Sequence, residues 1–283
     1  MDDQALFTKA GVGRGSNDSL NKRREEILIT LYHSEEPTLQ SVREKWILFL
    51  RTLCSEEFDD VRIEKRGGRG ASFDFVIVFL RNGISIKTIR AEFKHNVGRI
   101  DKLPQYFSPA ADKIYMPRLY ADMFYDYLDE ICSIYPDVSS VKPDREMYLR
   151  LVHNNDYERH PFFKGLHTLE TTGTKEQYQR KKTVVARSIR EFLTMYADKL
   201  NLEELSKDIR ERQTDKLFVM WNLSEFKSDI IRPDEMELTH VERVKNGNTI
   251  VVVSKCGTKH NMLLRWKNHL GILYPAWQIS LTR

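Results

Sequence analysis

The sequence has few cysteines and no arrangement that would pair them. Its three cysteines are far apart and odd in number: Cys54, Cys132 and Cys256. That spacing argues against a disulfide framework and against a Cys-x-x-Cys zinc site. We therefore expect the protein to work in a reducing, intracellular setting.

Long apolar runs are also missing. No run approaches the roughly 20 residues that a helix needs to cross a bilayer, so we expect no membrane partner. Residues 1–18 lack the basic and apolar regions of a secretory signal, and they are predicted to be a flexible leader. No internal repeat or low-complexity tract is present.

The composition is that of a globular protein. Hydrophobic residues make up 41% and charged residues 30% of the 283 residues, which is enough to bury the core of one elaborated domain over 19–283. The net charge of +4 is mildly favourable for a nucleic-acid partner.

The first third of the chain has a regular pattern of helices and strands. Apolar residues recur at helical spacing over 21–33 and again after Pro37, which predicts two helices. Three strands are predicted to follow, over 60–66, 72–80 and 84–95. The second of these is apolar almost throughout, as in a strand that is buried on both faces of a sheet.

Three charged residues stand on the second and third predicted strands. Asp74 is on the apolar strand, and Glu92 and Lys94 lie two residues apart on the next, so these two share a face. Acidic groups at the rim of a buried strand usually have a cation or a metal as partner. Taken singly, these residues also have an ordinary interpretation, in which Asp74 caps the end of a strand and Glu92 and Lys94 form the solvated stripe of an edge strand.

The face on which Asp74 lies depends on the Asn-Gly turn between the two strands. A two-residue turn pairs Leu80 with Ser85 and points Asp74 away from Glu92. A three-residue loop with a bulge pairs Leu80 with Ile84 and brings Asp74 to the face of Glu92. Only the second register builds a site.

This pattern resembles the PD-(D/E)xK nuclease superfamily, which has the restriction-endonuclease-like fold. The resemblance rests on Asp74, a gap of seventeen residues, and then Glu92-Phe93-Lys94, within residues 19–107. Phe73 stands where the motif is named for proline. The resemblance implies an α/β (α+β) fold: an αβββαβ core with a central mixed sheet, a helical insertion and a β-rich C-terminal extension.

The resemblance also implies roles for these residues. Asp74 and Glu92 would bind Mg²⁺ or Mn²⁺ with help from the Phe93 carbonyl, and Lys94 would orient or deprotonate the attacking water. Such an ion and an ammonium group stabilise the negative charge that builds on the phosphoryl oxygens. Glu26 on the first helix is a further candidate ligand, although a surface glutamate is the more ordinary interpretation.

Several other residues are candidates for nucleic-acid contact: Arg66 and Arg69 in a glycine-rich loop, Asn96 after the third strand, Gln105, and Arg180 and Arg187 on a basic helix. Gln105 is similar in place to a glutamine of exonuclease relatives, but Pro109 stands where their tyrosine would be. Basic helix faces are most often merely solvated.

The rest of the chain is predicted to surround this core. The core covers 19–109 and 213–230, a mainly helical insertion covers 110–212, and a β-rich part covers 231–283. Residues 217–223 are the strand that would complete the core sheet.

From these patterns we expect a metal-dependent nuclease that hydrolyses phosphodiester bonds in DNA, an endonuclease of restriction-like type. Two alternatives stay open: a catalytically inactive nuclease-fold protein that binds nucleic acid, and an RNA-cleaving endonuclease. Cutting both strands of DNA ordinarily takes two active sites, so a homodimer is a further expectation, although no residue pattern points to it.

Overall fold

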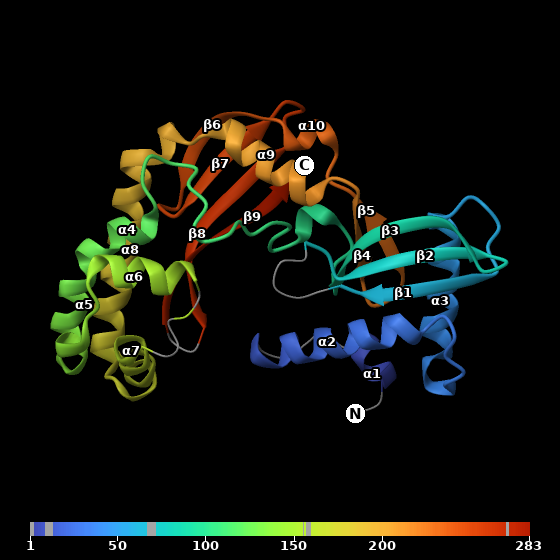
Figure 1. Cartoon of the computed structure of the whole chain (residues 1–283), viewed down its shortest axis with the longest axis horizontal. Coiled ribbons are helices and arrows are strands. Elements are labelled where there is room, and N and C mark those ends of the chain that lie inside the picture. Colours follow the sequence, from blue (N-terminus) through green and yellow to red (C-terminus); the bar gives the residue numbers. More distant parts are fainter. Residues whose placement is uncertain (1–2, 9–13, 67–71, 155, 157–159, 270–271) are drawn as a thin grey trace. The chain divides into compact units, whose positions relative to one another are not determined.

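The computed structural model describes residues 3–8, 14–66, 72–154, 156, 160–269 and 272–283. The chain divides into two compact units (Figure 1). The first consists of 1–103 and 210–233, and the second of 104–209 and 234–283. The second unit includes both the mainly helical segment over 104–209 and the β-rich segment over 234–283. That 19–283 behaves as a single domain stays a prediction.

The first unit is built on a mixed five-stranded sheet. Its strands are adjacent in chain order: β1 (Asp60–Lys65), β2 (Phe75–Arg81), β3 (Ile84–His95), β4 (Lys216–Trp221) and β5 (Phe226–Asp229). β1, β2 and β3 form an antiparallel meander, β4 runs parallel to β3, and β5 is antiparallel to β4. The prediction of a mixed α/β protein with a mixed sheet is confirmed.

Helices cover one face of this sheet with an apolar core. They are α1 (Asp3–Thr8), α2 (Arg14–Thr30) and α3 (Gln40–Leu53), which follows a short 3-10 turn, η1 (Pro37–Leu39). In Figure 1, α2 runs along the sheet. The buried core side chains alternate along the strands, as on one face of a pleated sheet, and include Ile63, Phe75, Ile77, Phe79, Ala91, Phe93, Val219 and Trp221.

The prediction of a flexible leader is wrong for Asp3–Thr8. These residues form α1, whose Leu6 and Phe7 are buried in the core of the first unit. Two side chains fix the carbonyls at the end of this helix: Arg24 Nε donates to Leu6 O at 2.6 Å, and Trp221 Nε1 donates to Phe7 O at 2.7 Å. Apolar burial and satisfied carbonyls together hold the segment.

The β2–β3 hairpin has neither of the two expected registers. Its turn is the two-residue one, Asn82-Gly83, with both φ angles positive and Leu80 opposite Ser85. A bulge then shifts the pairing between Phe79 and Leu80, leaving one extra residue on β3. Beyond the bulge Phe75 pairs with Ala91, so Asp74, just before β2, is level with Glu92. A tight turn therefore brings Asp74 to Glu92 after all.

The second unit combines helices with an antiparallel four-stranded sheet. The strands are adjacent in chain order: β6 (Leu238–Lys245), β7 (Thr249–Ser254), β8 (Lys259–His269) and β9 (Ile272–Thr282). The helices include α4 (Tyr120–Phe124), α5 (Leu128–Ile134), α6 (Arg145–His153), α7 (Pro161–Thr172), α8 (Lys175–Tyr196) and the larger part of α9 (Leu202–Gln213), whose residues from Arg210 on belong to the first unit. α7 begins at Pro161, since proline fits the first turn of a helix, where its missing N–H is not needed.

Two expectations from composition can be compared with the structure. The three cysteines are free thiols, with Cys54 and Cys132 buried and Cys256 exposed. None of the helices in the described ranges is long and apolar enough to span a membrane.

The packing of α1 makes a testable prediction. Phe7→Ala should lower the free energy of unfolding by about 3–5 kcal/mol, because it deletes a fully buried aromatic ring and leaves a cavity. Urea denaturation measures the change. Leu48→Ala on α3 is the control, since that side chain is 61% exposed and its loss should change the free energy by only about 0.5 kcal/mol. A Phe7→Ala protein as stable as the control would contradict the packing of α1.

Candidate active site

The three charged residues predicted as a site lie together on the first unit. Glu92 and Lys94 are side by side on β3, and Oε1 of Glu92 is ion-paired with Lys94 Nζ. Asp74 precedes β2, and its Oδ2 accepts a hydrogen bond of 2.9 Å from the backbone N–H of Phe93, between the other two residues. The hairpin therefore gathers two carboxylates and an ammonium group.

Backbone hydrogen bonds fix the position of Asp74. Its N–H donates to Ala91 O at 2.9 Å, and its carbonyl accepts from Arg66 N at 2.8 Å. The Phe93 N–H, in turn, faces the Asp74 side chain.

A second lysine, which the sequence did not indicate, completes the charged cluster. Lys216 is the first residue of β4, in parallel register with Arg90 of β3. Its Nζ lies 2.5 Å from Glu92 Oε2 and donates to Ser72 O at 3.0 Å. Only 3% of its side chain is exposed, against 25% for Lys94 and 15% for Glu92. Glu92 is thus held by two lysines, one through each oxygen.

Lys216 stands directly before a strand that the sequence predicts. That strand was predicted over 217–223 from its apolar run, so its first residue follows Lys216. A strand that runs parallel to β3, however, begins level with the Arg90 to Glu92 segment. A lysine at the start of such a strand stands beside the acidic residue of its neighbour.

Burial and charge shift the pKa values of two members of this cluster. Burial raises the pKa of Asp74; the Phe93 N–H acts against this, and the nearby Glu92 carboxylate adds to it. Burial lowers the pKa of Lys216, and its ion pair with Glu92 acts in the opposite sense. Each group is held where its charged form is costly unless a partner of opposite sign is present.

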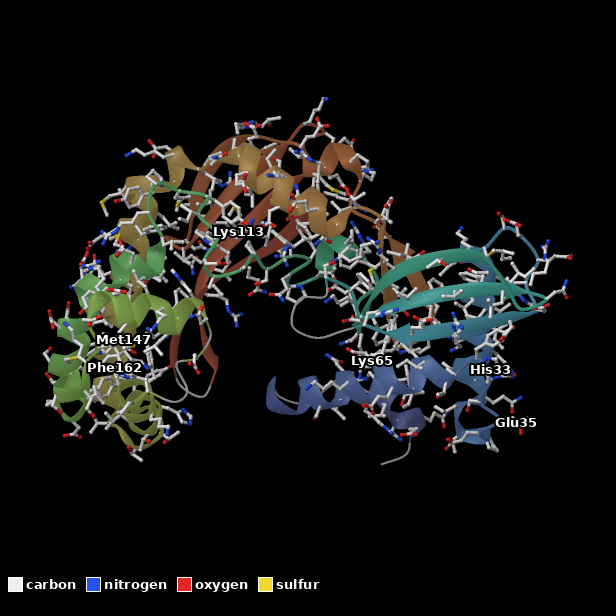
Figure 2. The ribbon with its side chains drawn as sticks, in the orientation of Figure 1. His33, Glu35, Lys65, Lys113, Met147 and Phe162 are labelled. Carbon is white, nitrogen blue, oxygen red and sulfur yellow. The ribbon has the colours of Figure 1, made fainter. Side chains whose placement is uncertain are left out.

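On α2, the residue that faces the cluster is Glu25. Glu26, the further metal ligand that the sequence suggested, is poorly placed for that role. Glu25 is half-buried, and its pKa is raised by burial and by the Asp74 carboxylate, while Lys65 and Lys94 oppose the rise. Glu26 is exposed and lies 3.9 Å from the ammonium group of Lys65, at the end of β1 (Figure 2). One position along a helix turns a side chain by roughly 100°, which sends the two glutamates in different directions.

The donor atoms fit a small, hard cation. Oδ1 of Asp74 has no hydrogen-bond partner among the described residues, and Glu92 and the Phe93 carbonyl supply further oxygens. No three His, Cys, Asp or Glu side chains within the described ranges form a complete metal cage. Mg²⁺ does not require one, because it usually binds one or two carboxylates and keeps waters or substrate phosphates as its other ligands.

The residues predicted to contact nucleic acid are spread over both units. In the first unit, the exposed Arg66 is ion-paired with Glu64 at 2.9 Å, and Asn96 is exposed with a φ of 57° just after β3. Arg69 lies outside the described residues. Gln105 belongs to the second unit and is half-buried.

Arg180 and Arg187 stand on α8 of the second unit. Arg187 is ion-paired with Glu130, and its Nε lies 3.8 Å from Glu191. Arg180 is exposed and has no ion pair with another described residue. Of the two, Arg180 has the charge that is available to a phosphate.

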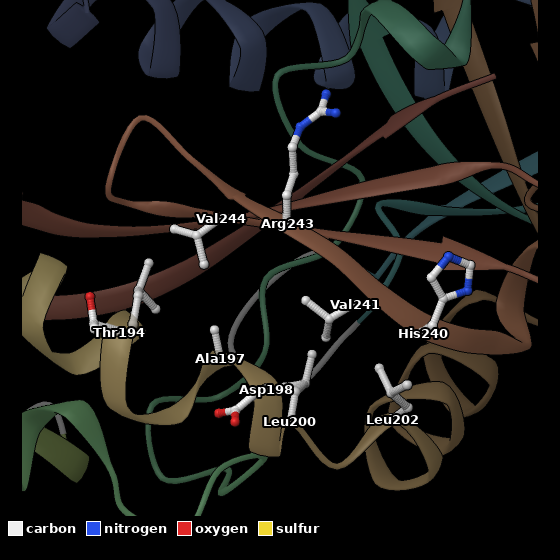
Figure 3. A pocket seen from close by; sticks show the side chains of 10 residues that line it. Thr194, Ala197, Asp198, Leu200, Leu202, His240, Val241, Arg243 and Val244 are labelled. Carbon is white, nitrogen blue, oxygen red and sulfur yellow. The ribbon is translucent and has the colours of Figure 1, made fainter.

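A pocket of about 540 Å³ lies elsewhere, in the second unit (Figure 3). It is bounded by α8, the 3-10 turn η6 (Ala197–Lys199) and the edge strand β6. Much of its lining is apolar, with Leu193, Leu200 and Val241 among the contributors. Such a lining suits apolar contact rather than a metal ion.

Comparison with known proteins does not assign a function. No family model matches the chain. A search of curated proteins likewise returns no match. The functional argument therefore rests on the geometry of Asp74, Glu92, Lys94 and Lys216.

The raised pKa of Asp74 predicts how stability depends on pH. The native state disfavours the ionised carboxylate, so the contribution of Asp74 to stability should fall as the pH rises from about 4 through the raised pKa. Asp74→Asn should therefore raise the free energy of unfolding at pH 7, with the advantage vanishing in acid, where Asp74 itself is neutral. Urea denaturation between pH 3 and pH 7 measures this, with the exposed Glu56→Gln as a near-neutral control. A variant less stable than wild type at pH 7 would contradict the pKa direction.

Proposed function

We propose that this chain is a metal-dependent nuclease that hydrolyses phosphodiester bonds in DNA, with the restriction-endonuclease-like fold. The observation that carries the proposal is the meeting of Asp74, Glu92 and Lys94 on one hairpin, where Asp74 Oδ2 accepts from the amide between the other two. Two carboxylates and an ammonium group at one point are the elements of a phosphodiesterase site.

The fold order supports the same proposal. Helices precede an antiparallel meander of three strands, and β4 then joins β3 in parallel. An αβββαβ core has this order of elements. The long segment between β3 and β4 would be the insertion, and it contains most of the second unit.

The side chains have distinct roles in this proposal. Asp74 and Glu92 would hold Mg²⁺ or Mn²⁺ with the Phe93 carbonyl, and the ion would lower the pKa of a bound water and stabilise charge on the phosphate. The Lys94 side chain is 25% exposed and can turn from Glu92 Oε1 toward the water or a phosphate oxygen. Glu25 adds negative charge beside Asp74.

One observation favours the alternative of a protein that binds nucleic acid without cleaving it. Both oxygens of Glu92 are ion-paired with lysines, which neutralises the carboxylate that would ligate the ion. A metal would have to compete with at least one ammonium group. Cleavage assays decide between the two functions.

The central prediction concerns cleavage. Purified protein with Mg²⁺ or Mn²⁺ should cut plasmid DNA and should stop in chelator, and Asp74→Asn and Lys94→Met should each lower the rate by at least about 100-fold. Lys227→Met is the matched control, because it removes an exposed, ion-paired lysine from β5 of the same sheet.

The same assay tests the other expectations. Linear plasmid formed without nicked circles would support two sites acting together, as in a homodimer, and parallel incubations with single-stranded DNA and RNA test the preference for DNA. Rates that are equal in wild type and variants would eliminate the site. Tight binding without cleavage under either metal would establish the alternative.

Two neighbouring glutamates provide a sharper comparison. Glu25→Gln should raise the Mg²⁺ concentration for half-maximal cleavage by about tenfold, because it removes a carboxylate next to Asp74. Glu26→Gln should leave it unchanged, since that side chain is exposed and pairs with Lys65. Titration of cleavage rate against Mg²⁺ measures both. A larger effect at Glu26 would contradict the assignment.

A further inference from the structure

We propose that Lys216 is a positioning residue of this site, which ties the segment that carries Asp74 to the strand that carries Glu92. The inference rests on the proposed function and adds to it a residue on a third strand. Lys216 Nζ bonds at once to Glu92 Oε2 on β3 and to the carbonyl of Ser72, two residues before Asp74. One ammonium group thus joins both acidic segments.

The surroundings of Lys216 leave its side chain little freedom. The side chain is 3% exposed, and its Nζ stands 4.8 Å from the centre of the Phe218 ring. A buried ammonium group needs its acceptors, because an unpaired charge there would lack solvation. A carboxylate, a carbonyl and an aromatic face supply that need, so the contacts with Glu92 and Ser72 are difficult to exchange for water.

The two lysines on Glu92 therefore differ in what they can do. Lys94 is 25% exposed and can leave Oε1, whereas Lys216 is enclosed and keeps Oε2. Glu92 is then held by one oxygen and offers the other in a fixed direction. This division frees Lys94 for the substrate without releasing Glu92.

The fold places Lys216 at this point by a tight connection. α9 ends at Gln213, and Asp215 takes a left-handed conformation with φ of 59°, which aspartate tolerates better than most residues. The next residue, Lys216, begins β4 in register with Arg90. Parallel pairing along β3 then holds the lysine beside Glu92.

Removal of the Lys216 charge should change the metal affinity and the rate of the chemical step in different ways. Lys216→Met makes the site more negative, so Mn²⁺ should bind as tightly as in wild type or more tightly. The rate of a single turnover at saturating Mn²⁺ should nevertheless fall by at least about tenfold, because Glu92 and the Asp74 segment are no longer held in place. Calorimetry with Mn²⁺ alone gives the affinity without reliance on activity, and Lys227→Met is again the control.

A second measurement needs neither metal nor substrate. Amide hydrogen exchange by NMR should show the Phe93 N–H, which bonds to Asp74, exchanging at least about tenfold faster in Lys216→Met, with amides of α3 unchanged. If Lys216→Met does not fold, Lys216→Arg keeps the charge but moves the donor atoms, and the same pattern is expected.

The outcomes separate this inference from the proposed function. Wild-type exchange at Phe93 together with a wild-type turnover rate in the folded variant would overturn the role of Lys216, even in an active nuclease. A slow turnover that extra Mn²⁺ fully restores would also overturn it, because Lys216 would then act on metal binding. If wild-type protein neither binds Mn²⁺ nor cleaves, the nuclease proposal fails, and the exchange experiment still decides whether Lys216 ties the two segments.

Discussion

Glu92 sits between two ammonium groups, and the arrangement of the site depends on this shared carboxylate. Lys94 reaches it along the same strand, and Lys216 reaches it from the neighbouring parallel strand. Removing one member of a buried pair typically costs about 3–5 kcal/mol, because the remaining charge is left without a partner. Lys216 also donates to the carbonyl of Ser72, so its ammonium group connects the segment before β2 to β3 as well.

The charged cluster contains two groups whose burial lowers the stability of the protein. Asp74 and Lys216 are both held where burial disfavours their charged forms. A protein selected only for stability would have neutral side chains at such positions. Keeping a carboxylate and a lysine there is typical of sites that use charge. The stability of this unit comes instead from the apolar face under α1, α2 and α3.

Much of this arrangement could be predicted from local sequence. The bounds of β3 were predicted to the residue, and Asp74, Glu92 and Lys94 lie together on the hairpin. The bulge could not be predicted, because no glycine or proline marks an extra residue within β3. Lys216 was also missed, since its place depends on a parallel pairing between segments more than a hundred residues apart. Long-range pairing, rather than propensity, was the missing information.

The bulge on β3 determines on which face of the sheet Asp74 lies relative to Glu92. The turn alone would direct Asp74 to the sheet face opposite Glu92, and a single inserted residue, remote from both, reverses that outcome. The geometry of the charged cluster at one end of the hairpin thus depends on the number of residues in β3 near the other end. Deletion of that one residue would therefore separate Asp74 from Glu92, although every charged residue of the site stayed in the chain. In divergent sequences, the position of the β-bulge is therefore more informative than the number of residues between the two acidic residues.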